Sequence, residues 1–103
     1  MELLSGGEMI ARFLKDEGVE YIYGYPGGAL LHIYDALYRQ DAVEHVLVRH
    51  EQAATHMADA YARVNQHLGV VVTSTGTGAG NAAGAMVEAL TAGTPMLHLT
   101  GQI

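Results

Sequence analysis

Apolar and polar positions alternate along this chain with two different periods, which together predict four strands and four helices in turn. Short apolar runs typical of strands occupy residues 19–23, 44–48, 68–73 and 95–100. Apolar residues spaced three or four apart predict the helices. The first helix opens at Ser5, with Glu8 completing a capping box, and ends at Gly18. The other helices are expected at residues 30–38, 52–64 and 81–92.

The same spacing predicts which side chains of three helices face the core. They are Met9, Ile10, Phe13 and Leu14 in the first helix, Leu30, Tyr34 and Leu37 in the second, and Ala54, Met57, Ala58, Tyr61 and Ala62 in the third.

Strand and helix alternate four times, which favours an α/β fold: a parallel sheet with helices on both faces and right-handed crossovers. Ligands of such sheets bind beyond the carboxyl ends of the strands. The unusual residues of this chain fall there, at 24–28, 49–52, 74–80 and 101–102, each after a predicted strand. We therefore expect four loops on one edge of the sheet to form a site.

Size and charge exclude several classes of protein. The 103 residues are enough for one small domain, 1–103. A net charge of −6 with a single lysine, Lys15, argues against nucleic-acid binding. There is no cysteine for a disulfide and no 18-residue apolar stretch to span a membrane, so we expect a cytoplasmic protein. The sequence stops on a predicted buried strand and its turn, and we expect the chain to be an incomplete piece of a longer one.

The loop at 74–81 reads Ser-Thr-Gly-Thr-Gly-Ala-Gly-Asn, between a strand and a helix, which is the context of a phosphate-binding turn. Asn81 stands where a dinucleotide-binding motif needs glycine, and no Gly-Lys-Ser/Thr occurs. Two interpretations stay open: the glycines bring backbone against a flat ligand, or they let a helix of small residues pack on the sheet. The turn at 25–28 is equally compatible with a simple connection.

Glu51 is the candidate catalytic residue, because it places a carboxylate between an apolar strand and an alanine-rich helix. We expect desolvation to raise the pKa of Glu51, so that it exchanges a proton near neutral pH. The alternative is a glutamate that only stabilises the start of its helix.

The remaining polar residues suggest structural roles. A zinc-protease motif would need a second histidine at position 54, where Ala54 stands, and His56 is off that face. We expect a structural ion pair at Arg49 and a surface pair between Asp59 and Arg63. The other histidines are expected at the surface or hydrogen-bonded in the core: His32, His45, His67 and His98.

Four segments in order carry a resemblance that covers nearly the whole chain. They are Gly-Tyr-Pro-Gly-Gly-Ala at 24–29, Ile-Tyr-Asp-Ala-Leu at 33–37, Val-Arg-His-Glu-Gln-Ala-Ala at 48–54 and Met-Ala-Asp at 57–59. The chain resembles the N-terminal, pyrimidine-binding domain of thiamine-diphosphate-dependent enzymes, and within them the acetolactate synthase (acetohydroxyacid synthase) catalytic subunit. The resemblance implies the thiamine-diphosphate-binding fold, here truncated.

The resemblance also implies the chemistry. Glu51 would hydrogen-bond N1′ of the cofactor's aminopyrimidine, and the 4′-amino group would then take the proton from C2 of the thiazolium. Attack on a 2-oxo acid such as pyruvate, loss of CO2 and addition to a second 2-oxo acid would give acetolactate, for branched-chain amino-acid biosynthesis. Other cofactor-binding residues would be Pro26, Gly27, Gly76, Gly78, Asn81 and Gln102.

Some positions depart from the family pattern: Thr75, Thr77, Gly80 and His32. They leave open another thiamine-diphosphate enzyme (a decarboxylase, carboligase or acyl-CoA lyase) or a non-catalytic binding domain. Nucleotide binding through the glycine loop is a further alternative.

The family also implies parts that this sequence lacks. Mg2+ and the diphosphate would be held by a second domain, usually from the partner subunit, and FAD by a central domain. We therefore expect no metal site here, a homodimer or higher oligomer with a shared active site, a regulatory subunit in some cases, and no activity from these 103 residues alone.

Overall fold

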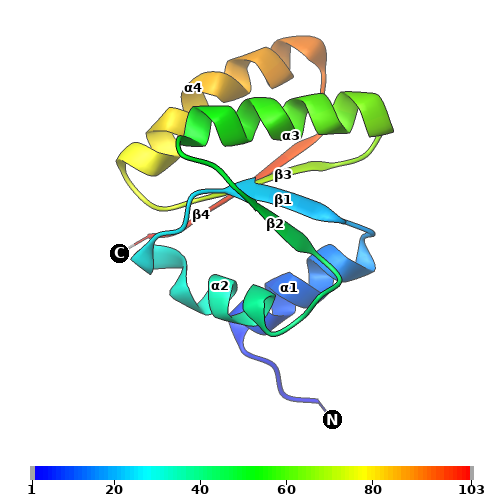
Figure 1. Cartoon of the computed structure of the whole chain (residues 1–103), viewed down its shortest axis with the longest axis vertical. Helices are drawn as coiled ribbons and strands as arrows, with labels where there is room; N and C mark the ends of the chain where they lie inside the picture. Colours follow the sequence, from blue (N-terminus) through cyan, green and yellow to red (C-terminus); the bar gives the residue numbers. More distant parts are fainter. Residues whose placement is uncertain (1, 103) are drawn as a thin grey trace.

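The computed structural model describes residues 2–102, and its strands and helices follow one another in the predicted order (Figure 1). The elements are α1 (Gly6–Asp16), β1 (Tyr21–Gly24), the 3₁₀ turn η1 (Gly28–Leu30), α2 (Leu31–Tyr38), β2 (Glu44–Leu47), α3 (Glu51–Asn65), β3 (Gly69–Thr73), α4 (Thr77–Ala92) and β4 (Met96–Thr100). The predicted start of α1 is confirmed, because the Ser5 hydroxyl accepts a hydrogen bond from the Glu8 amide.

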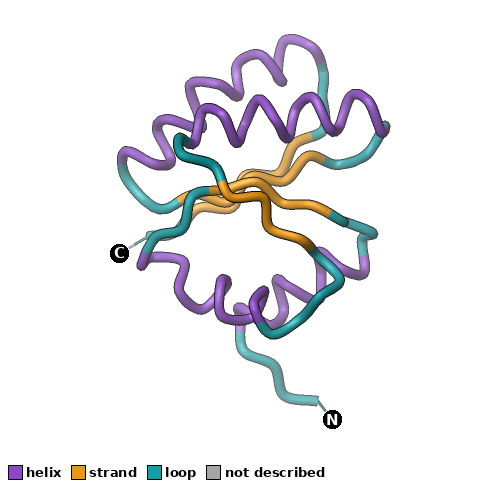
Figure 2. The backbone as a smooth tube through the Cα atoms, viewed as in Figure 1, coloured by secondary structure: helices purple, strands orange, loops and turns teal. Residues whose placement is uncertain are grey.

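The four strands form one parallel sheet in the order β2-β1-β3-β4. Central strand β1 pairs with both β2 and β3, and Tyr23 lies opposite Val46 on one side and Val71 on the other. Helices α1 and α2 cover one face of the sheet, and α3 and α4 cover the other (Figures 1 and 2). The predicted α/β fold is therefore confirmed.

The core consists of two apolar layers, one on each face of the sheet. Leu14, Ile22 and Leu37 belong to the layer under α1 and α2, and the layer under α3 and α4 is built largely from alanine and valine. Every residue of β3 is buried, as expected for a parallel strand that is covered on both faces. No helix within residues 2–102 combines the length and hydropathy needed to cross a membrane.

Three side chains predicted to face the core are exposed instead. Met9, Phe13 and Met57 are 56%, 51% and 41% exposed. In α1 the buried stripe contains Gly7, Ala11 and Leu14. A side chain at Gly7 would collide with the carbonyl group of His32, so the two helices on this face touch through small residues and the larger ones lie beside the contact.

Helix α4 begins four residues earlier than predicted, at Thr77 rather than at 81. Gly76 adopts a positive φ of 62° at its N-cap, and the Gly80 amide already bonds to the Gly76 carbonyl. The glycines that indicated a loop therefore form the first turn of the helix.

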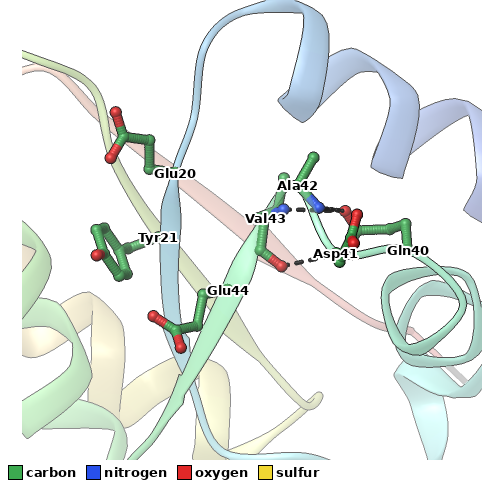
Figure 3. Close-up of a pocket in the computed structure, with 7 residues that line it drawn as sticks. All are labelled: Glu20, Tyr21, Gln40, Asp41, Ala42, Val43 and Glu44. Atoms are coloured by element: carbon green, nitrogen blue, oxygen red, sulfur yellow. Dashed lines mark hydrogen bonds between the residues drawn. The ribbon is translucent and has the colours of Figure 1, made fainter.

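Gln40 holds the connection between α2 and β2 with four hydrogen bonds, of which those to Ala42 and Val43 are drawn in Figure 3. Its Nε2 donates to the carbonyl oxygens of Leu37 at 2.7 Å and Val43 at 3.0 Å. Its Oε1 accepts from the amides of Ala42 at 2.8 Å and Val43 at 2.9 Å. One side chain thus provides partners for backbone groups that neither the helix nor the strand satisfies.

We expect Gln40→Ala to lower the free energy of unfolding by about 2 kcal/mol, because water recovers only part of four bonds worth about 1 kcal/mol each. Urea unfolding followed by circular dichroism measures the change. Gln40→Glu is the matched variant and should also be less stable than the wild type, since a carboxylate accepts from both amides but sets a negative oxygen against the Leu37 and Val43 carbonyl oxygens. A loss below about 0.5 kcal/mol for Gln40→Ala would contradict this role.

Candidate functional site

Glu51 lies at the carboxyl edge of the sheet, as the first residue of α3 and shortly after the end of β2. Its side chain is half-buried, and Oε1 accepts a hydrogen bond from Nδ2 of Asn81 at 3.1 Å. Asn81 belongs to α4, which follows β3. The loops after two different strands therefore meet here, as the position of the unusual residues predicted.

Gly78 provides the space in which the Glu51 carboxylate lies. A Cβ atom added to Gly78 would lie 3.0 Å from Oε2 of Glu51, closer than side chains normally approach. That oxygen accepts no hydrogen bond from any of the described residues, whereas Oε1 is held by Asn81. Glu51 thus presents one restrained oxygen and one available oxygen at the sheet edge.

The loops after β1 and β4 meet the same edge. A Cβ atom at Gly27 would overlap the Ser74 side chain, so this turn lies directly against the end of β3. Gly101 packs against Ala29 in the same way. Pro26 and Gln102 are exposed, and neither contacts Glu51 through a hydrogen bond within residues 2–102.

The predicted site residues therefore fall into two groups. Glu51, Gly78 and Asn81 are in direct contact. The others lie on the same edge and are joined to it through neighbouring residues or through the turn that opens α4; these are Pro26, Gly27, Gly76 and Gln102.

The expected rise in the pKa of Glu51 is wrong for this arrangement. The hydrogen bond from Asn81 is the main cause that lowers the pKa of Glu51, and the nearby backbone amide of Glu51 itself lowers it further. Desolvation acts in the opposite direction but is the smaller effect. A carboxylate at a helix N-terminus with an amide donor beside it is stabilised in its charged form.

Two ion-pair predictions need correction. Arg49 is exposed and forms no ion pair within residues 2–102, so its expected structural pair is absent there. Asp59 and Arg63 do pair, with two contacts of 2.9 Å, but Asp59 is only 5% exposed rather than on the outer surface. Arg63 also contacts Glu88 of α4 at 3.3 Å, so the pair links the two helices.

Two of the remaining histidines have hydrogen-bond partners, as predicted. Nε2 of His45 lies 2.9 Å from the Tyr34 hydroxyl, and Nε2 of His98 lies 2.7 Å from the Thr73 hydroxyl. His32 is exposed, but the buried Nδ1 of His67 has no partner among the described residues, contrary to the prediction. No group of three or more histidine, aspartate or glutamate side chains in residues 2–102 could hold a metal ion.

Sequence reasoning missed two residues that hold the start of α3. Nδ1 of His50 accepts a hydrogen bond from the Gln52 amide at 3.0 Å, and the Thr55 hydroxyl donates to the Glu51 carbonyl at 3.0 Å. Thr55 is fully buried and its hydroxyl also lies 3.5 Å from the Ala82 carbonyl of α4. The only signal for His50 was its place just before the helix, where Ser, Thr, Asp and Asn are the usual caps.

A cavity of 680 Å³ lies at the opposite edge of the sheet, where β1 and β2 begin. Glu20, Asp41 and Glu44 line it, and in Figure 3 the carboxylates of Glu20 and Glu44 lie away from Gln40, on the side of Tyr21. It contains none of the predicted site residues.

The Glu51 carboxylate and the glycines around it lie at the carboxyl edge of a parallel sheet, which is where ligands of such sheets bind. A sequence model of the family described as "Thiamine pyrophosphate enzyme, N-terminal TPP binding domain" matches residues 4–103. The chain belongs to this family, which confirms the resemblance drawn from its motifs.

Within this family, the chain is similar to the large subunits of acetolactate synthases. The chain is 52% identical over 103 residues to the acetolactate synthase large subunit of Haemophilus influenzae and, equally, to the acetolactate synthase isozyme 3 large subunit of Escherichia coli. Both matches cover 100% of this chain and 18% of the relative. A probable acetolactate synthase large subunit of Methanocaldococcus jannaschii is 48% identical over 100 residues, 97% of this chain and 17% of that protein. The chain thus spans less than a fifth of the relatives it matches.

We expect Asn81→Ala to destabilise the fold at neutral pH but not in acid. Because the folded-state pKa of Glu51 lies below its ordinary value of 4.5, its charge adds stability above that pH, and the gain is lost as the pH falls through the lowered pKa. Removing the Asn81 donor should therefore cost about 0.5 kcal/mol at pH 7, a small value because Glu51 is partly exposed.

Urea unfolding at pH 7 and at several pH values below 4.5 measures this difference, with Asn65→Ala as the control. Asn65 also carries a hydrogen-bonded amide, but it donates to the Tyr61 carbonyl and to no titrating group. A loss for Asn81→Ala that is the same at every pH would contradict the assignment of the Asn81–Glu51 bond.

Proposed function

We propose that this chain is the pyrimidine-binding part of a thiamine-diphosphate-dependent, acetolactate synthase-like enzyme. The whole enzyme would join two molecules of pyruvate into acetolactate with release of CO2, a step in branched-chain amino-acid biosynthesis. The observation that carries the proposal is the position of Glu51, held by Asn81 at the carboxyl edge of the sheet. The names of the relatives, all acetolactate synthase subunits in the matches above, support the choice of reaction.

The residues at this edge fit the aminopyrimidine ring. Oε2 of Glu51 has no hydrogen-bond partner within the described residues, so it is available to a ring nitrogen. Gly78 lets the Glu51 carboxylate lie close to the start of α4, and Gly27 lets the turn after β1 lie against Ser74, because a Cβ at either glycine would meet those side chains. Pro26, Gly76, Asn81 and Gln102 would complete the edge around the ring.

The sequence predicts that Glu51 exchanges a proton near neutral pH. With its lowered pKa, Glu51 would instead act as a charged carboxylate. A carboxylate that stays charged favours a proton on the ring nitrogen beside it, through a charge-assisted hydrogen bond. Asn81 keeps Oε1 charged and in place, and the ring would exclude water from Oε2. When bound, thiamine diphosphate supplies the carbon that attacks the 2-oxo acid and the electron sink that accepts the resulting charge.

Several parts of the proposed enzyme would lie outside these residues. Mg2+ and the diphosphate would be held by another domain, as the resemblance to the family implies. The same proposal includes FAD, a homodimer or higher oligomer with a shared active site, a regulatory subunit and a cytoplasmic location. The relatives are long enough to contain such parts, because this chain matches only 18% of their length.

A sister activity on the same cofactor is the second candidate. Thr75 and Thr77 depart from the usual loop before Asn81, and the family model covers thiamine pyrophosphate enzymes in general. A decarboxylase, carboligase or acyl-CoA lyase would use Glu51 in the same way.

Product analysis separates these candidates. The longest natural chain containing this segment is supplied with pyruvate and Mg2+, with and without thiamine diphosphate. Cofactor-dependent acetolactate supports the proposal. Acetaldehyde, or CO2 without ligation, indicates a sister activity. If no 2-oxo acid gives a product whose formation depends on thiamine diphosphate, both candidate functions are wrong.

We expect Glu51→Gln in that full-length protein to lower kcat at least about 100-fold, because the amide keeps the shape of the carboxylate but carries no charge to hold a proton on the ring. Steady-state kinetics at saturating cofactor measures the loss. Glu17→Gln, an exposed position at the end of α1, is the control and should remain active. Full activity in the Glu51 variant would mean that the mechanism is wrong.

The 103 residues alone are expected to bind the cofactor weakly and to catalyse nothing, because the groups for the diphosphate and Mg2+ would be absent. They should also self-associate, since Leu47, Tyr38 and Leu90 are 63%, 90% and 82% exposed. Isothermal titration with thiamine diphosphate and sedimentation velocity test the two statements. Turnover by this segment would disprove the first, and a monodisperse monomer at high concentration the second.

A further inference from the structure

His50 caps α3 with a ring nitrogen. Its backbone is extended, with φ of −158° and ψ of 137°, and Nδ1 accepts a hydrogen bond from the amide of Gln52 at 3.0 Å. The first amides of a helix have no partners within the helix, and a cap usually supplies an oxygen to one of them. In this chain the imidazole takes the place of that oxygen.

The cap uses one particular atom of the ring. Nδ1 accepts the hydrogen bond from the Gln52 amide through its lone pair. This bond commits Nδ1 to the helix, although His50 as a whole is an exposed residue.

Glu51 lies between the two residues that this bond joins. Its backbone is therefore fixed on one side by the cap and on the other by the Thr55 hydroxyl, which donates to its carbonyl at 3.0 Å. The position of the backbone decides whether Oε1 can reach Nδ2 of Asn81, at 3.1 Å, because the side chain has only a short reach.

We infer that His50 is a positioning residue for Glu51, which acts by capping α3 and not by exchanging protons. Loss of the cap lets the first turn of α3 fray, and the carboxylate then leaves the place that Asn81 and Gly78 define. The effect on activity rests on the proposed function, whereas the effect on the helix does not.

Two substitutions separate capping from proton exchange. Asparagine is among the preferred caps and can accept from the Gln52 amide, but it cannot carry a titrating proton. Leucine can do neither. His56→Leu is the matched control, because His56 is an exposed histidine on the same helix and not at its start.

The experiment uses the full-length protein and measures hydrogen exchange of the peptide that covers the start of α3, together with kcat and KM for pyruvate at saturating cofactor. In His50→Leu we expect exchange to be about fivefold faster and kcat about tenfold lower, with KM within about twofold. His50→Asn should restore exchange and kcat to within about threefold, and His56→Leu should change neither.

Several results would overturn the inference. Unchanged exchange in His50→Leu would show that the imidazole is not the cap. Faster exchange with unchanged kcat, in a protein that Glu51→Gln inactivates, would show that the cap does not position Glu51. Restored exchange without restored kcat in His50→Asn would assign the ring a direct role. If Glu51→Gln stays active, the proposed function fails, and the exchange result alone decides whether His50 holds the turn.

Discussion

Parallel pairing of β1 with both of its neighbours is the constraint on which the rest of this structure depends. Because β2, β1 and β3 run in the same direction, their carboxyl ends meet at one edge, and the helices that follow β2 and β3 both start there. Helices α3 and α4 consequently begin side by side, which is why a carboxylate on one and an amide on the other come within 3.1 Å. The order and direction of the strands thus bring Glu51 and Asn81 together.

Small side chains allow α3 and α4 to pack closely against the sheet and against each other. Ala54, Ala58 and Ala82 are fully buried beneath them. Burial tends to raise the pKa of Asp59, but hydrogen bonds from Arg63 and Thr94 outweigh it, and the pKa of Asp59 is lowered. The same arginine reaches Glu88 on the neighbouring helix. Apolar contact brings α3 and α4 together, and a charged link at the far side from Glu51 orients them.

The order and type of the strands and helices could be predicted because each element buries one face and its period appears in the sequence. Errors arose where a distant partner decides the outcome. Met9 and Phe13 were expected inside, but Gly7 lets α1 approach α2 so closely that larger side chains lie beside the contact. The pKa of Glu51 depends on Asn81, thirty residues further along the chain, and no local pattern indicates the direction of that shift.

The order of strands in the sheet has a consequence for synthesis on the ribosome. β1 can pair with β2 soon after both emerge, but its other partner is β3, and Tyr23 and Val71 are nearly half the chain apart. β4 then adds to β3 and comes last. Until β3 has emerged and paired, one edge of β1 and the apolar faces of β1, β2, α1 and α2 can contact other chains. A chain that emerges from the ribosome is therefore most open to aggregation between the emergence of β2 and that of β3.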